Sequence, residues 1–365
     1  MVAALLYKSD WPAARERLAA WWRREAMDRP AIEVTAPRDR PIAGPEPPPK
    51  TGRPEEDWLD FEAVLARQEG VFRRTAFLGE AYPGVEVSLG PGVLGALLGA
   101  RCSFQERTVW YDPCFDGPAS AHLAWDDERP LWRWTLKNTA LALERGAGRW
   151  VVDLPDLIEN VDTLAALVGT EALLIALAVS PDEIHRLQRS LLPLWFRAYE
   201  PLWECVSAAE GGAGWLCFKA WAPGRMAKLQ CDLSAMISPA MFDDLVAPYL
   251  VEQAAGIDFC LYHLDGPDAV KHLDTVLSIP GLDVLQWSPG AGQAHGGDPA
   301  WDGVYRAALD AGKGIQAYMP IEAVPAFVRR LGRRGVYIET RAPSEAEAER
   351  LLRAVAAPKK GGKNP

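Results

Sequence analysis

The chain has 365 residues, a formal net charge of −10 and 49% hydrophobic residues. This acidic balance argues against a nucleic-acid or anionic-membrane surface. The length suits a large α/β barrel, and such a chain can bury its core without disulfide staples. The six cysteines form no CxxC pair, the first residues are too weakly apolar for a signal peptide, and no apolar run reaches the length of a membrane span. We therefore expect a cytoplasmic protein with reduced thiols.

The first part of the chain mixes helices with isolated strands. Its patterns predict helices over 10–27, 57–76 and 130–146, and strands over 31–37 and 108–112. Ser9 or Asp10 can cap the first helix, and a proline follows at its start. The proline-rich residues 38–54 are expected to form a loop.

From residue 149 onward, strand-like and helical stretches alternate. The predicted strands are 149–155, 214–221, 228–232, 258–265, 283–287, 314–319 and 335–340. The predicted helices are 161–178, 181–207, 239–256, 267–277, 300–311, 321–332 and 344–356. Such alternation indicates a parallel sheet. It predicts a single (β/α)8 TIM barrel over 1–357, with 1–147 as decoration that adds a strand or two, and a disordered tail over 358–365.

In a barrel of this kind, the loops after the strands carry the site. The polar and aromatic residues at the predicted strand ends are Asp153, Asp156, Trp221, Arg225, Cys231, Asp232, Ser234, His263, Asp265, Gln286, Trp287, Tyr318, Glu339 and Arg341. Side chains two residues apart on a strand point the same way, so His263 and Asp265 share a side where their strand ends.

Three stretches resemble the uroporphyrinogen decarboxylase superfamily, which also holds zinc-dependent methyltransferases that move methyl groups between corrinoid proteins and thiols. They are LQCDLSAMISPAMFDDLVAPYL, LYHLDGPDAVKHLDTVLSIPGLDVLQWSPGAG and GVYIETRAPSEAEAERLL, and an uncharacterised branch carrying HLDGP is the nearest match. The resemblance implies a (β/α)8 barrel with a pocket at its carboxyl-terminal mouth. It covers most of the chain, but one superfamily hosts several reactions, so it does not fix the chemistry.

The motifs of the superfamily are only partly present. His263 falls on the histidine of the methyltransferases' zinc pair, and Asp265 replaces the cysteine. Ala342 stands where the last zinc cysteine is expected, with Glu339 as the replacement nearest to it. The arginine-rich motif of the decarboxylases is not visible, and Cys231 and Asp232 fall on their aspartate-serine pair.

The histidine–aspartate pair has three readings. The first is a zinc site of His263 and Asp265 with Glu339 or Cys231 as third ligand, because zinc takes imidazole nitrogen, carboxylate oxygen and thiolate. The second is a metal-free pair in which Asp265 orients His263 as a general base. The third is structural: Asp265 caps the following helix. For Cys231, buried packing is favoured over a role as nucleophile or soft ligand, because activation of the thiol needs a cation or metal nearby.

The other candidates would contact a small substrate. Arg225 would clamp an anionic group, and Gln286 with Trp287 would orient the ligand. Trp221, Asp156 and Tyr318 complete the expected pocket, and surface or core roles remain the alternatives for Arg225 and Trp287.

These observations favour a zinc-type enzyme that transfers a methyl or alkyl group through a metal-activated thiol or alcohol. His263, Asp265, Asp232 and Cys231 would be its catalytic residues. One alternative is a metal-independent decarboxylase or lyase, and another is a non-catalytic ligand-binding barrel. The expected partners are a small molecule and, for methyl transfer, a corrinoid protein as donor, with neither nucleic acid nor membrane. The oligomeric state stays open, with a homodimer among the alternatives.

Overall fold

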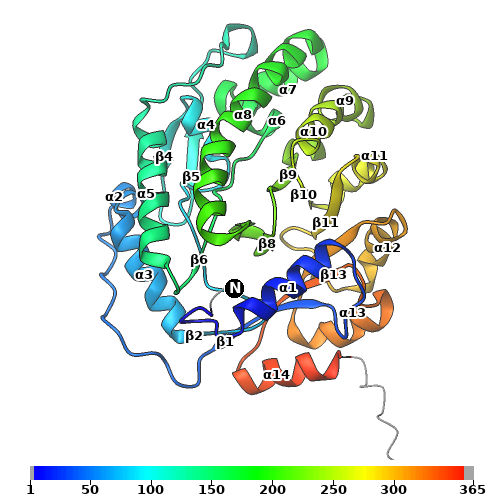
Figure 1. Cartoon of the computed structure of the whole chain (residues 1–365). Helices are drawn as coiled ribbons and strands as arrows, with labels where there is room; N and C mark the ends of the chain where they lie inside the picture. Colours follow the sequence, from blue (N-terminus) through cyan, green and yellow to red (C-terminus); the bar gives the residue numbers. More distant parts are fainter. Residues whose placement is uncertain (1–3, 357–365) are drawn as a thin grey trace, which may run out of the picture.

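The computed structural model describes residues 4–356 (Figure 1). The predicted tail over 358–365 lies outside the described residues. Within that part of the chain, no helix is both long enough and apolar enough to cross a bilayer.

The centre of the structure is a seven-stranded, mostly parallel sheet. Its strands lie in the order β2 (Thr75–Gly79), β1 (Ala31–Pro37), β13 (Val336–Arg341), β12 (Gly314–Tyr318), β11 (Leu282–Ser288), β10 (Phe259–Asp265) and β9 (Met226–Gln230). Strand β2 pairs antiparallel with β1, and every other pairing is parallel. Strand β1 spans the predicted residues, and strands β9 to β13 are largely buried, as expected where helices cover a parallel sheet.

Six shorter strands lie outside this ladder. They are β3 (Gly84–Glu86), β4 (Arg101–Phe104), β5 (Val109–Asp112), β6 (Val151–Asp153), β7 (Ala213–Trp215) and β8 (Ala220–Ala222). Strand β3 pairs parallel with β6, and a single bridge between Leu154 and Trp215 joins the end of β6 to β7. The backbone ladder does not close, so the pairing establishes a mostly parallel α/β fold and leaves the predicted barrel as an inference.

Helices surround the sheet. The α-helices are α1 (Trp11–Trp22), α2 (Pro54–Leu59), α3 (Phe61–Arg74), α4 (Val93–Leu98), α5 (Pro130–Gly146), α6 (Asn160–Val168), α7 (Thr170–Val179), α8 (Pro181–Glu210), α9 (Pro239–Leu245), α10 (Ala247–Ala254), α11 (Leu273–Ser278), α12 (Asp302–Asp310), α13 (Val324–Leu331) and α14 (Glu345–Ala354). Figure 1 shows α9 to α13 outside strands β9 to β13. The helices predicted over 57–76, 161–178 and 239–256 are each broken in two.

The prediction of a single strand over 214–221 is wrong. Strands β7 and β8 form an antiparallel hairpin, joined by the one-turn 3-10 helix η2 (Leu216–Phe218) and by Lys219. Lys219 has a φ of 47°, in the left-handed region that a side chain with a Cβ seldom occupies. The chain therefore reverses where an extended segment was expected.

Helix α1 covers the amino ends of the strands. The indole nitrogen of Trp21 donates to the carbonyl oxygen of Gly335, just before β13, and that of Trp22 donates to the carbonyl of Trp221 in β8. Both indoles are fully buried. This arrangement leaves the carboxyl ends of the strands as the side on which polar groups can gather.

Candidate functional site

The register of three adjacent parallel strands brings polar side chains together at their carboxyl ends. His263 in β10 lies beside Gln230 in β9 and beside Gln286 in β11. Two residues beyond the first pair come Asp232 and Asp265, which lie just past β9 and at the last position of β10.

Asp232, His263 and Asp265 form the metal-competent group of the described residues. One ligand atom from each lies within 4.8 Å of the other two. Two carboxylates and one imidazole offer the oxygen and nitrogen donors that zinc takes, and two negative charges balance a divalent cation.

The imidazole of His263 is held in one orientation. Its Nδ1 contacts the amide oxygen of Gln286, whose amide nitrogen donates to the carbonyl of Trp287 at 3.2 Å. The ring of Phe218 packs against the other side, with centroids 4.9 Å apart. Because the amide oxygen accepts a hydrogen bond, it fixes the proton on Nδ1 and leaves the Nε2 lone pair free for a metal or a proton. The donor set therefore fits a metal ion.

Asp232 is anchored through a chain that begins at a buried lysine. Lys228 is fully buried, lies 2.7 Å from an oxygen of Asp156 and donates to the amide oxygen of Gln230. Because the amide oxygen of Gln230 accepts from Lys228, its amide nitrogen faces the other way and donates to Asp232 Oδ2 at 3.0 Å. Burial alone would lower the pKa of Lys228, but Asp156 and Glu159 outweigh it and raise the pKa.

The loop that carries Asp232 is fixed by a second carboxylate. Asp162 in α6 accepts from the backbone nitrogens of Asp232 and Leu233 at 2.7 and 3.0 Å. Burial, followed by the nearby Asp232, raises the pKa of Asp162 to about 6. Burial also raises the pKa of Asp232, against the opposing effects of His263 and Lys228. The pKa values of both Asp162 and Asp232 are therefore raised.

Glu339, the expected third ligand, lies in a different group. Its carboxylate is 2.7 Å from Lys219 Nζ, which is also 3.0 Å from Glu33. Glu33 and Glu339 are register partners on β1 and β13, so the lysine sits between two adjacent carboxylates. The structure brings Asp232, rather than Glu339 or Cys231, to His263 and Asp265.

Arg225 and Trp221 lie away from these strand ends. Arg225 immediately precedes β9, at its amino end, where its guanidinium pairs with Glu200 and donates to the Gly256 carbonyl at 2.9 Å. Trp221 is buried against Trp11, beneath the guanidinium of Arg15. Arg225 is occupied by its ion pair and Trp221 by core packing, and both lie away from the strand ends where a substrate contact was expected.

The remaining predicted residues divide between interior and surface. Cys231 is buried, and burial raises the pKa of its thiol well above the ordinary value, which opposes a nucleophilic role. Trp287 is buried against Trp301, whereas Tyr318 is 50% exposed at the end of β12. Asp156 pairs with Lys228 and accepts from Trp215 Nε1 at 3.2 Å, so it is part of the buried network.

Lys228, Gln230 and Asp162 were not among the site residues predicted from the sequence. The pattern KLQCD places Lys228 and Gln230 two apart, hence on one side of the strand with Asp232. That spacing was a usable signal for the first two residues. Asp162 had none, because it reaches Asp232 from a helix 70 residues earlier.

A neighbouring carboxyl supplies a pH test. Glu86 ends β3, and burial, together with Asp156, raises its pKa to about 8. An unfolded glutamate titrates near pH 4.3, so between that value and pH 8 the folded state holds the extra proton. Stability should therefore fall as pH rises through this interval.

Glu86→Gln stays neutral at every pH and should gain about 2 kcal/mol over wild type between pH 6 and pH 8. Urea unfolding at the two pH values measures this gain. Glu62→Gln, an exposed change in α3, is the control and should follow wild type. Equal pH dependence of Glu86→Gln and wild type would contradict the assignment.

Comparisons with known proteins support the fold. The chain matches the solved structure of a methyltransferase from Methanosarcina mazei with a TM-score of 0.58 and 13% sequence identity, over 93% of this chain and 97% of that one. No family model and no curated protein matches the chain. The two proteins therefore share a fold along nearly their whole lengths.

Proposed function

We propose that the protein is a metal-dependent enzyme of the methyltransferase type, with a zinc ion bound by Asp232, His263 and Asp265. The convergence of these three groups at the strand ends carries the proposal. The orientation of His263 by Gln286 supports it, since metal-binding histidines normally donate their other N–H to an acceptor.

The fold inferred with this function is a (β/α)8 barrel of the uroporphyrinogen decarboxylase superfamily. The likeness to the archaeal methyltransferase supports it, as does the way β3, β6 and β7 continue from the β9 edge of the sheet. The three metal-competent side chains then lie at the barrel mouth, where such folds carry their sites.

The proposed reaction is the transfer of a methyl or alkyl group to a thiol or alcohol. A bound zinc ion would supply Lewis-acid activation of that nucleophile at neutral pH. The protein's own residues orient the ligands. Gln286 orients the imidazole of His263, and Lys228, acting through Gln230, orients the carboxylate of Asp232. The methyl donor in this proposal is a corrinoid protein.

A metal-free acid–base function is the second candidate. The proximity of Asp232 to His263 favours it, because burial raises the pKa of this carboxyl and a carboxyl beside an imidazole can exchange a proton with it. In that case the pair would manage protons in a decarboxylase or lyase.

Metal and thiol titrations separate the two candidates. Purified protein should bind one zinc per chain, measured by competition with a chromogenic chelator and by elemental analysis. The cobalt-loaded protein should develop a thiolate-to-metal absorption band when 2-mercaptoethanol is added. Zinc well below one per chain after growth in added zinc would defeat the metal proposal and leave the acid–base pair. Metal binding without the thiolate band would refute thiol activation.

A further inference from the structure

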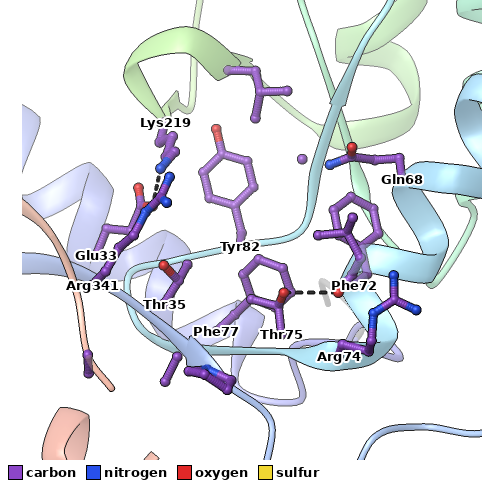
Figure 2. A pocket seen from close by; sticks show the side chains of 16 residues that line it. Glu33, Thr35, Gln68, Phe72, Arg74, Thr75, Phe77, Tyr82, Lys219 and Arg341 are labelled. Carbon is purple, nitrogen blue, oxygen red and sulfur yellow. Dashed lines mark hydrogen bonds and ion pairs between the residues drawn. The ribbon is translucent and has the colours of Figure 1, made fainter. Parts of the chain in front are cut away.

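A cavity lies at the carboxyl ends of β1 and β13, apart from the metal-competent group. Its volume is about 520 Å³, within the range of small-molecule pockets. Figure 2 shows side chains from β1, α3, β2, β13 and the β7–β8 hairpin around it. Asp232, His263 and Asp265 are not among its lining residues. Leu216 and Lys219 line it, while Phe218 between them packs on His263, so the η2 turn separates the two regions.

One wall of the cavity is apolar and aromatic. Phe72 in α3 and Phe77 in β2 pack edge to face, with ring centroids 5.8 Å apart, and the Tyr82 ring stands beside them (Figure 2). Val71 remains 46% exposed at this wall. Apolar surface left open in a concave site favours the burial of an apolar ligand body.

The charges around the cavity are predominantly positive. Arg74, Lys219 and Arg341 line it together with one carboxyl group, Glu33. Lys219 is neutralised by its contacts with Glu33 and Glu339. Arg74 and Arg341 form no ion pair or side-chain hydrogen bond with the described residues.

The single lining carboxyl adds little negative charge. Burial, and then the neighbouring Glu339, raise the pKa of Glu33, and its carboxyl already lies 3.0 Å from Lys219 Nζ. The two arginines are therefore uncompensated cations beside a low-dielectric wall. Such a field attracts an anion, and a guanidinium can bind a carboxylate through two hydrogen bonds.

We propose that this cavity binds a small organic carboxylate, with its apolar body against Phe72, Phe77 and Tyr82 and its carboxylate at Arg341, while Arg74 adds positive charge on the opposite side (Figure 2). The aromatic wall and the unpaired guanidinium groups supply the two halves of this recognition. The site is distinct from the proposed metal site and goes beyond the proposed function, since it does not require a metal.

Calorimetric titration with 4-phenylbutyrate tests the proposal on the full chain. The neutral analogue 4-phenyl-1-butanol should bind at least about tenfold more weakly, because it keeps the body and lacks the charge. Arg341→Met should weaken binding of the acid about tenfold, Arg74→Met should weaken it less, and both should leave binding of the alcohol unchanged. Arg329→Met removes an exposed arginine outside the cavity and should bind like wild type.

Three results would overturn the proposal: no binding of the acid, equal binding of the acid and alcohol, or equal weakening by Arg329→Met and the cavity variants. Repeating the titration with and without one equivalent of zinc keeps the outcome apart from the metal proposal. Binding of the acid should persist in both, even if zinc itself does not bind.

Discussion

Lys228→Met is expected to lower the free energy of unfolding by about 3–5 kcal/mol, because it leaves a buried carboxylate without its cation. Lys228 is fully buried, and its ammonium group lies 2.7 Å from Asp156 Oδ1. Asp156 is 7% exposed and cannot turn to water. Methionine fills most of the same volume, so the loss is one of charge pairing rather than of packing.

The measurement is urea unfolding followed by circular dichroism. Lys271→Met is the matched control, because Lys271 is exposed and makes one hydrogen bond, to the Ala235 carbonyl. Its expected change is below about 0.5 kcal/mol.

If Lys228→Met does not fold, a double variant can still test the prediction. Asp156→Asn keeps an oxygen for Trp215 Nε1 but removes the charge, so Lys228→Met/Asp156→Asn should recover about 1–3 kcal/mol. A double variant no more stable than the single one would show that the pair is not the source of the loss.

The strands that could be predicted from the sequence are those whose structure follows from the local pattern of apolar residues and turn residues. Strand β1 matched over its full predicted range, and β10 and β11 matched to within a residue or two, because each is a short apolar run bounded by breakers. The run GWLCFKAW has the same local character and yet folds as a hairpin.

The cause of that difference lies far away in the chain. Lys219 holds its left-handed backbone while its side chain contacts Glu33 and Glu339, and its carbonyl accepts from Tyr337 at 2.7 Å. A left-handed lysine costs on the order of 1 kcal/mol, which these contacts offset. Partners more than 100 residues away leave no periodic trace around residue 219.

For the site, too, the sequence predicted which residues lie at strand ends but not which side chains pair with one another. Fourteen residues at the predicted strand ends were candidates, and three of them, Asp232, His263 and Asp265, form the metal-competent group. Glu339 was also a candidate, but it lies within β13 and pairs with Lys219. Arg225 lies immediately before β9, which begins at Met226, so it is at the amino end of the strand and not at the carboxyl end, where the site was expected.

His263→Ala is expected to abolish stoichiometric zinc binding while the fold survives. The variant loses the nitrogen donor of the proposed site and keeps two carboxylates, which alone favour harder cations over zinc. The large hydrophobic core does not rest on a metal, so the unfolding midpoint of the metal-free protein should change little. His122→Ala, an exposed change elsewhere, should keep one zinc per chain.

Gln286 variants show whether His263 acts as an oriented ligand. Gln286→Leu removes the acceptor at Nδ1 and should weaken zinc binding about 10–100-fold, measured by chelator competition. Gln286→Glu restores an acceptor at the same place and should return most of the affinity, which a purely structural role for Gln286 would not require. If both Gln286 variants bind zinc like wild type, His263 is not held through Nδ1. If His263→Ala also keeps its zinc, the metal lies elsewhere, and Asp232, His263 and Asp265 are better explained as a proton-transfer group.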